Sequence, residues 1–518
     1  MLALAFFSFD TLDLGAVWAS RIVGEPLGGA GYRLGVWDLD GDGYDDLVLA
    51  EPGVDKVWVL YGPLKGDTLD LLWLSGRYTL IYGPSDDSVG YSFTAGDFDG
   101  DGWLDLAVAR DRRGPYAVYI IFGPMGERRE VDLSHPHDQR VVDFRNFPWS
   151  SDAGHVLAAG DLNGDGYDDL VIGAPRASVN YFTNNGEIFI AWGRERWDST
   201  IIVDAWHGVS PAFGGDDSQL LGSGLAVGDF NGDGMEDLAI GWPGYSLVPN
   251  AGGVLVLPGA DTQWFDTLNL LWEWWPGSKL LVGDQAYAQF GKTLAAGDFN
   301  GDGYDDLAVA APRYRWGEPN SGAVYIVYGP FPETLRTGED GGFTLITWSW
   351  QNAFMGRSLA FGDLDGDGRD ELVVAAPLLN WEGRGFAGAA WVLRYPLPDT
   401  VDLVKPLFRT PFLVGGDEYK LGEGIAVGDF DADDEAELAL GAPWADAFKT
   451  RPDAGFVIIV PDLTGQSVWE SPAKREFYEV YDPSGRLLYK GKTLPRSLPR
   501  GRVLLLLGPS GRRTLLLK

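Results

Sequence analysis

Seven short segments of the chain place acidic side chains at alternate positions, in six of them around two glycines, a spacing that suits a hard metal ion. The stretch GDFNGDGYDDLAVAAP, residues 297–312, has oxygen-bearing side chains at positions 1, 3, 5 and 9 counted from Asp298, and glycines at positions 4 and 6. Carboxylate and carbonyl oxygens are ligands of Ca²⁺, and glycine allows the tight turn that brings them together. The segment therefore predicts a calcium loop, with the backbone carbonyl of position 7 as a further ligand.

The loop is not an EF-hand. Position 12, where an EF-hand carries a bidentate glutamate, is Val309 in this chain. The flanking runs TLAAG and LAVAA are short and apolar, and Gly or Pro bounds them, which is typical of strands rather than helices. We therefore expect a metal-binding turn between two strands.

The same signature recurs at intervals of 59 to 69 residues, each time with an apolar residue at position 12. In the seventh copy Ala432 and Asp434 replace the two glycines, so calcium binding there stays open and the chain predicts about six or seven Ca²⁺ sites. The predicted ligands at positions 1, 3, 5, 7 and 9 are Asp38, Asp40, Asp42, Tyr44 and Asp46; Asp97, Asp99, Asp101, Trp103 and Asp105; Asp161, Asn163, Asp165, Tyr167 and Asp169; Asp229, Asn231, Asp233, Met235 and Asp237; Asp298, Asn300, Asp302, Tyr304 and Asp306; Asp363, Asp365, Asp367, Arg369 and Glu371; and Asp429, Asp431, Asp433, Glu435 and Glu437.

Each repeat carries the same strand pattern. A small-residue strand precedes the loop, a second strand follows it, and a third strand such as AVYIVYGP and a looser fourth such as FTLITW come later. Four strands per repeat without helices predict an all-β fold, a seven-bladed β-propeller of four-stranded blades. The pattern stops after residue 460, and RIVGE at 21–25 is expected to supply the missing strand, a Velcro closure that removes a free sheet edge.

The stretch FGKTLAAGDFNGDGYDDLAVAAP resembles the FG-GAP repeat of integrin α-subunit propellers and of many secreted bacterial proteins. The resemblance covers residues 16–470 and implies a propeller stabilised by calcium, with the loops on the face opposite the usual ligand surface. In such a fold the calcium sites hold the blades together, while recognition falls to the loops 2–3 and 4–1.

The ligand surface expected on that face collects aromatic and arginine side chains after the second strands: Arg176, Trp242, Arg313, Trp316, Trp381 and Trp444. Tyr287, Trp348 and Trp350 precede first strands on the same face. Aromatic and arginine residues anchor interfaces, but aromatics can also fill the wedge between blades, and both interpretations stay open. The run LLWEWWPG at 270–277 is likewise expected either to form a patch on a loop or to fill the space between blades.

The two ends of the chain differ from its middle. The first residues, MLALAFFSF, indicate a truncated signal peptide within residues 1–15, or alternatively an extra apolar strand. Residues 473–518 contain eleven Lys or Arg against three Asp or Glu and predict a small β domain. The segments VYDPSGRLLYKG and LPRG, with a last strand ending in Lys, resemble a sorting domain of the type IX secretion system; the alternatives are an accessory sheet and a basic patch docking on the propeller.

Composition limits the functions. The net charge of −35, of which seven calcium ions would offset 14, argues against a nucleic-acid partner, and no apolar run is long enough for a transmembrane helix. With four histidines and no cysteine, an enzyme is not expected; His135 and His137 could hold a transition metal or be ordinary polar residues. The sequence favours a secreted or bacterial cell-surface module that binds an extracellular protein or glycan. The alternatives are a calcium-dependent polysaccharide lyase or hydrolase and a structural surface-layer component.

Overall fold

The computed structural model describes most of residues 20–460 and five separate strands outside that range. The gaps within 20–460 are residues 65–67, 75, 85–86, 111–116, 128–129, 137–139, 149, 180–181, 204–208, 214–216, 246–249, 261–267, 270–275, 404–411, 431–435 and 447–451. The further strands cover residues 11–13, 478–481, 487–491, 503–507 and 513–517. Most of the predicted signal segment thus lies outside the described residues.

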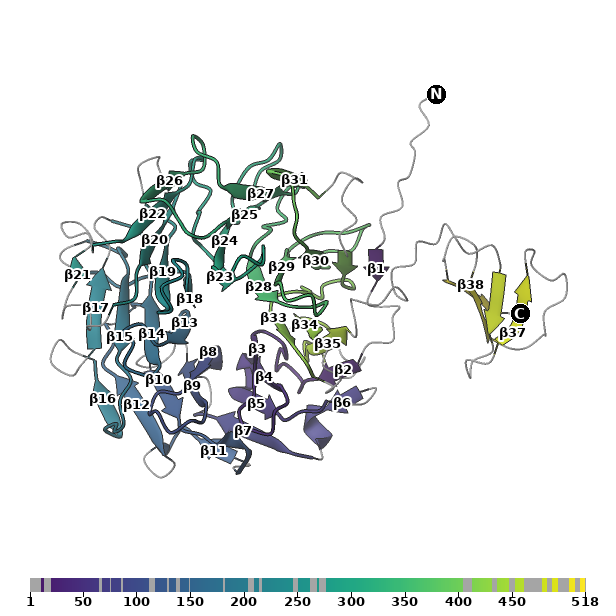
Figure 1. Ribbon diagram of the computed structural model, residues 1–518. Coiled ribbons are helices and arrows are strands. Elements are labelled where there is room, and N and C mark those ends of the chain that lie inside the picture. The colour runs from purple at the N-terminus through teal and green to yellow at the C-terminus, as the bar shows by residue number, and fades with distance from the viewer. Residues whose placement is uncertain are drawn as a thin grey trace. The chain divides into compact units, whose positions relative to one another are not determined.

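Seven sheets, each with four antiparallel strands, stand around a central axis with the first strand innermost (Figure 1). This arrangement is the predicted seven-bladed propeller, and the turns between strands 1 and 2 are the acidic loops. In order from strand 1 to strand 4, the blades are β3 (Leu34–Trp37), β4 (Asp46–Glu51), β5 (Lys56–Leu60) and β7 (Tyr78–Tyr82); β8 (Val89–Gly96), β9 (Asp105–Arg110), β10 (Ala117–Ile121) and β12 (Val141–Arg145); β13 (Leu157–Gly160), β14 (Asp169–Ala174), β15 (Glu187–Ala191) and β17 (Val209–Phe213); β18 (Leu225–Gly228), β19 (Asp237–Trp242), β20 (Gly253–Leu257) and β22 (Lys279–Val282); β23 (Leu294–Gly297), β24 (Asp306–Ala311), β25 (Ala323–Val327) and β27 (Phe343–Thr347); β28 (Ser358–Gly362), β29 (Glu371–Ala375), β30 (Ala389–Leu393) and β32 (Phe412–Val414); and β33 (Ile425–Gly428), β34 (Glu437–Ala442), β35 (Phe456–Val460) and β2 (Ser20–Val23).

Every blade has a fifth strand that the sequence pattern did not predict. It pairs in parallel with strand 4 and, in six blades, comes from the connection between strands 3 and 4 of the next blade round the ring, so that each blade covers its neighbour's outer edge. These strands have only two or three residues, too few for a period-2 pattern to be read. From blade 1 to blade 7 they are β11 (Glu130–Asp132), β16 (Thr200–Ile202), β21 (Leu268–Asn269), β26 (Thr334–Arg336), β31 (Thr400–Asp402), β1 (Thr11–Asp13) and β6 (Thr68–Asp70).

The N-terminal segment closes the ring, as the sequence predicts. β2 pairs antiparallel with β35, with Ile22 opposite Val457, and so completes blade 7. β1 pairs in parallel with β32 of blade 6, and β6 of blade 1 pairs with β2 from the other side. Blades 6, 7 and 1 are therefore joined by strands from both ends of the propeller, and the fourth strands of blades 6 and 7, β32 and β2, are paired on both sides.

The core lies between neighbouring blades. Strands 2 and 3 are buried along almost their whole length, which explains their continuous apolar runs. One such cluster joins Phe299 and Val324 of blade 5 to Trp391 of blade 6. Three short 3₁₀ helices complete the described secondary structure of the propeller: η1 (Pro52–Val54), η2 (Leu71–Trp73) and η3 (Met125–Glu127).

Residues Leu463–Lys518 form a second compact unit, separate from Met1–Asp462. Its four strands make one antiparallel sheet in the order β37 (Leu487–Gly491), β36 (Tyr478–Tyr481), β38 (Val503–Leu507) and β39 (Arg513–Leu517). The sheet agrees with the strands expected from the sequence. Across the described residues, no helix is long and apolar enough to cross a membrane.

The closure strand should be sensitive to loss of its packing. Ile22 is 1% exposed and lies in the apolar cluster shared by blades 7 and 1. We expect Ile22→Ala to lower the free energy of unfolding of the full chain by about 2–4 kcal/mol, measured by urea denaturation. Ile202→Ala, at a position that is 38% exposed on β16, is the matched control and should cost well under half as much. Equal losses in both variants would contradict the closure described.

Candidate metal centres and the central cavity

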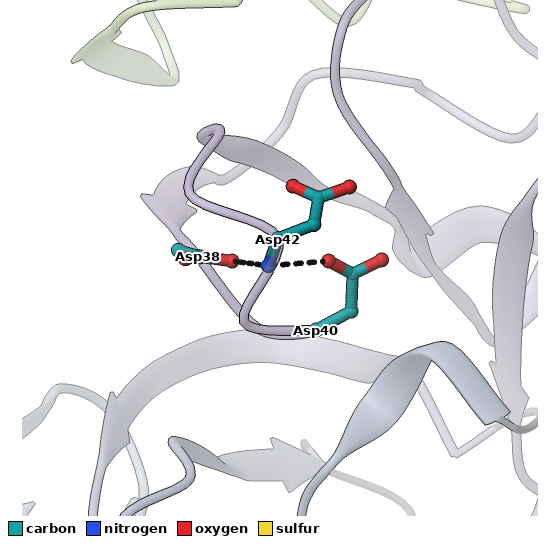
Figure 2. Close-up of side chains that lie close together, drawn as sticks. All are labelled: Asp38, Asp40 and Asp42. Atoms are coloured by element: carbon teal, nitrogen blue, oxygen red, sulfur yellow. Dashed lines mark hydrogen bonds between the residues drawn. The ribbon is translucent and has the colours of Figure 1, made fainter.

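The first acidic loop, residues 38–46, folds around the carboxylate of its first residue. Asp38 Oδ1 accepts hydrogen bonds from the backbone N–H groups of Gly41 (2.8 Å) and Asp42 (3.2 Å), and Asp38 Oδ2 accepts one from Gly43 (2.9 Å). Figure 2 shows the Asp42 N–H between the oxygens of Asp38 and Asp40. Gly41 and Gly43 have φ of +70° and +88°, a left-handed conformation that glycine adopts without strain.

Most of these bonds recur in the next five loops. In all six, the second carboxylate oxygen of position 1 accepts the N–H of the glycine at position 6 at 2.9 Å. Position 5 accepts the N–H of position 7 at 3.0–3.1 Å. Residues 431–435 of the seventh loop, with the predicted ligands Asp431, Asp433 and Glu435, lie outside the described residues.

The carboxylates at position 9 are the most deeply buried of each loop. Asp46 is fully buried, and its two oxygens accept the N–H groups of Leu39 (2.9 Å) and of Gly62 after strand 3 (2.9 Å). Burial raises the pKa of Asp46 to about 7 and that of Asp105 to about 8. The same cause raises the pKa of Glu371 to about 7. Negative charge is thus costly at these positions, and a cation beside them would offset that cost.

The oxygen donors of the loops fit a divalent cation. Asp38, Asp40 and Asp42 bring carboxylate oxygens within 4.8 Å of one another, and the first three acids of loop 2 do the same. In loop 6 the group is Asp363, Asp365 and Glu371. Asp365 Oδ1 and Asp306 Oδ2 are buried without a hydrogen-bond partner, as expected of oxygens that can take a cation instead.

Arginine side chains lie against three of the loops. Arg77 forms ion pairs with Asp40 and with Asp42 (3.1 Å) in loop 1. Arg140 lies 3.7 Å from Asp101 in loop 2, and Arg394 lies 3.3 Å from Asp365 in loop 6. Each guanidinium partly neutralises the acid cluster beside it.

A further acidic residue, whose role the motif did not predict, connects neighbouring loops. Asp305, at position 8 of loop 5, accepts the backbone N–H of Asp229 in loop 4 through Oδ2 (2.9 Å). The corresponding bonds are Asp97 N–H to Asp168 (2.8 Å), Asp298 N–H to Asp370 (3.0 Å) and Asp429 N–H to Asp45 (2.9 Å), and Glu236 bonds the Asp161 backbone. Position 8 is the first of the two consecutive aspartates in the motif YDDL, and this doublet is the sequence feature that could have indicated the role. Loop 2 has Leu104 and loop 7 has Ala436 at this position.

Position 7 also reaches across to the neighbouring loop. A Cβ atom added to Gly41 would lie 2.1 Å from the ring of Trp103, and one added to Gly232 would lie 2.3 Å from the ring of Tyr304. Position 7 was predicted only for its carbonyl oxygen. In loops 2, 3, 5 and 6 its side chain packs over the position-4 glycine of the preceding loop, so these four glycines are needed for space as well as for their φ.

A cavity of about 570 Å³ opens along the axis on the other face, where the first strands begin. All seven blades contribute to it, each through the residue that follows a glycine of positive φ at the start of strand 1. These seven residues are Tyr32, Tyr91, His155, Ser223, Lys292, Arg357 and Glu423. Because the acidic loops follow strand 1, the cavity and the loops lie at opposite ends of the blades.

Polar contacts link the cavity residues around the ring. His155 Nε2 lies 3.3 Å from Lys292 Nζ, and His155 Nδ1 lies 3.3 Å from the Tyr91 hydroxyl. Burial lowers the pKa of His155, so the neutral ring can accept from Lys292 through Nε2 and donate through Nδ1. On the other side, Arg357 Nε donates to Glu423 Oε1 at 3.0 Å.

The six residues predicted to form the ligand surface differ in their exposure. Arg176 and Arg313 line the cavity and are exposed. Trp444 is 51% exposed and lies under the ammonium group of Lys420. Trp242 and Trp381 are only 4% and 9% exposed and belong to apolar clusters, and Trp316 packs against another. These three rings therefore fill space in and between blades, the alternative that the sequence left open.

The other aromatic and histidine residues of the predicted sites differ in exposure. Trp350 is 40% exposed and stacks on Trp381 at 5.1 Å, whereas Trp348 is buried. Tyr287 is 63% exposed. His135 is 74% exposed and bonds Asp132, while His137 and most of the run at 270–277 lie outside the described residues.

The ring of seven blades and the acid loops in their hairpins define a seven-bladed β-propeller with metal-competent turns. The FG-GAP repeat family matches residues 153–190, 221–257, 290–327, 355–393 and 421–460, and the FG-GAP-like repeat family matches residues 38–108. These matches reach every blade. The propeller blades of this chain therefore carry FG-GAP repeats.

Curated relatives share the repeats over part of their length. The bovine (Bos taurus) phosphatidylinositol-glycan-specific phospholipase D is 32% identical over 202 residues, 38% of this chain and 23% of that protein. Integrin alpha-PS2 of Drosophila melanogaster is 32% identical over 256 residues, 46% of this chain and 16% of that protein. The chain thus spans less than a quarter of the length of these two relatives. Among solved structures, the V. cholerae biofilm matrix protein Bap1 aligns with 88% of this chain and 81% of its own at 12% identity, but its TM-score of 0.24 carries no conclusion.

The loop-to-loop bond at position 8 can be tested directly. Asp305→Ala leaves the Asp229 N–H without its carboxylate partner, and we expect a loss of about 1–3 kcal/mol in the free energy of unfolding. Asp399→Ala removes an exposed carboxylate and serves as the control, with an expected change below about 0.5 kcal/mol. Denaturant unfolding of the full chain measures both, and matching values would refute the proposed link.

Proposed function

We propose that this protein is a calcium-stabilised, extracellular propeller that binds a ligand at its central cavity and acts in adhesion. The observation that carries the proposal is the separation of two kinds of site. Acidic turns suited to metal lie at one end of the blades, and a polar cavity built from all seven blades lies at the other. Stabilisation and recognition can thus be performed by different residues.

Calcium is the metal that these loops suit best. Their donors are carboxylate, amide and carbonyl oxygens, which hard cations prefer, and the described loops offer no thiolate or imidazole. Bound Ca²⁺ would neutralise the converging carboxylates. Sites in extracellular modules often have Kd values of roughly 0.1–1 mM, which suit the calcium concentration outside cells.

An extracellular location agrees with several features. The similarity to integrin alpha subunits supports adhesion to a protein or glycan partner. The basic C-terminal unit, with its four-stranded sheet, supports the proposed type IX sorting role and anchoring at a bacterial cell surface. The apolar first residues support export through a signal peptide.

A second candidate function is that of a polysaccharide-active enzyme. Tyr91, His155 and Lys292 form a connected set of proton donors and acceptors in the cavity. Such a set could remove a proton from a sugar ring and return one to the leaving oxygen, as polysaccharide elimination requires. The basic side chains beside it could neutralise a substrate carboxylate. This connected set was not predicted from the sequence, because its three residues lie in three different repeats.

A glycan array probed with the full chain tests the function. We expect binding of a defined set of glycans in millimolar Ca²⁺ and at least a tenfold weaker signal in EDTA, because the blades that shape the cavity loosen. Tyr32→Ala, at the cavity, should lose binding, and Tyr395→Ala, which is 42% exposed outside it, should keep it. No binding to any glycan or extracellular matrix protein under either condition would overturn the proposal. Release of shorter oligosaccharides from a bound glycan would favour the enzyme instead.

A further inference from the structure

The central cavity concentrates positive charge in a protein that is strongly acidic overall. The chain has 75 acidic residues against 40 Lys and Arg, so an average surface would carry more acids than bases. The cavity reverses this ratio, with five permanent or near-permanent cations and one acid. Its charged lining consists of Arg33, Arg176, Lys292, Arg313, Arg357 and Glu423.

These cations repel one another. Burial lowers the pKa of Lys292 to about 8; Asp152 raises it, and Arg357, Arg176 and Arg33 lower it further. Arg357 is paired with Glu423 at 3.0 Å, and Arg176 lies 3.7 Å from Asp152. Within the described part of the chain, Arg33 and Arg313 form no ion pair. Holding these positive charges close together is electrostatically unfavourable unless an anion binds among them.

The rest of the lining suits a sugar. The rings of Tyr32 and Tyr91 stack with centroids 6.3 Å apart, and the Arg33 guanidinium lies 5.1 Å from the Tyr32 ring. Aromatic faces offer contact area to sugar rings, and hydroxyl groups such as that of Ser223 can bond sugar hydroxyls. The volume of about 570 Å³ is within the range of roughly 300–1,000 Å³ found for small-ligand sites.

We propose that the central cavity binds an acidic oligosaccharide, holding a carboxylate or sulfate group among Arg33, Lys292 and Arg357. Guanidinium and ammonium groups form their strongest hydrogen bonds with such anions. A long polyanion lying across the protein would meet its acidic remainder, whereas one or two charged sugar residues inside the cavity would not. The inference rests on the proposed ligand-binding function and names its ligand class.

Binding of matched probes to the full calcium-loaded chain tests the inference. Oligogalacturonate and a sulfated oligosaccharide are titrated by calorimetry, with fully methyl-esterified oligogalacturonate as the uncharged counterpart. Inorganic sulfate and hexaglutamate distinguish a free anion and an acidic peptide. We expect at least one acidic oligosaccharide to bind at least tenfold more tightly than the ester, sulfate or the peptide, with weaker binding at higher salt.

Two charge-removing variants locate the site. Lys292→Met and Arg33→Ala should each weaken that binding by roughly tenfold or more. Lys279→Met on the outer strand β22 and Arg196→Ala, whose side chain is 91% exposed, are the controls and should bind as the unaltered chain does. Melting curves in calcium confirm that all four variants fold. Unchanged binding in folded Lys292→Met and Arg33→Ala would overturn the assignment.

The pH dependence gives an independent readout. Arg33, Arg176, Arg357, Asp152 and His155 surround Lys292, and His155, whose pKa is lowered, is neutral above pH 7. Lys292 loses its proton as the pH rises past about 8, so binding should weaken between pH 7 and pH 9.5. Lys292→Arg should keep its affinity over that range.

The outcomes separate this inference from the proposed function. If neutral glycans bind on the array and no acidic probe does, ligand binding stands and the acidic class is wrong. Tightest binding by hexaglutamate or by inorganic sulfate would equally overturn the acidic oligosaccharide.

Discussion

The propeller depends on the carboxylates that accept the backbone N–H groups of its six fully described acidic turns. A hairpin bent so tightly leaves several N–H groups without strand partners, and the carboxylate at position 1 accepts three of them in loop 1. The carboxylate at position 9 accepts two more from a buried place. These bonds hold the turn in place, but they bring several negative charges within a few ångströms of one another. The geometry that satisfies the backbone N–H groups therefore also favours binding of a cation.

The same turns join the blades into a ring. The carboxylate of position 8 accepts an N–H from the preceding loop, and the side chain of position 7 covers the glycine of that loop. Outer edges are joined by the short fifth strands, and the two ends of the propeller by β1, β2 and β6. The loop links are uneven, because Leu104 and Ala436 cannot accept the N–H groups of Asp38 and Asp363. The blade 1–2 and 6–7 contacts therefore rely more on strand pairing and apolar packing, and blade 7 also carries the altered loop.

The sequence predicted the fold in outline because its signals are local and repeated. Seven copies of one loop, each followed by the same strands, fix the blade number, and RIVGE could be placed as the closing strand by its likeness to other fourth strands. The fifth strands were missed because triplets such as TLD at 68–70 and TVD at 400–402 are too short for periodicity, although their recurrence was visible. Position 8 was missed because its partner lies some 70 residues away in another repeat.

The candidate ligand site was less accessible to sequence reasoning for the same physical reason. Its seven innermost residues come from seven repeats and differ in type, so no motif collects them. Exposure also could not be assigned from residue type, since Trp242 and Trp381 pack in apolar clusters while Trp444 lies open. The residues that vary between repeats face the cavity, and those that recur build the turns. Recognition can therefore vary without disturbing the framework.

The central claim, that cations in the turns hold the blades together, is tested most directly by calorimetric titration of the metal-free full chain with Ca²⁺, with the melting temperature followed at each step. At free calcium ten times Kd, six sites would together contribute about 8 kcal/mol to the free energy of unfolding. The account predicts six or seven bound ions per chain and a melting temperature that rises as they bind. A chain that takes up no calcium, or whose melting temperature is the same with and without it, would contradict the account.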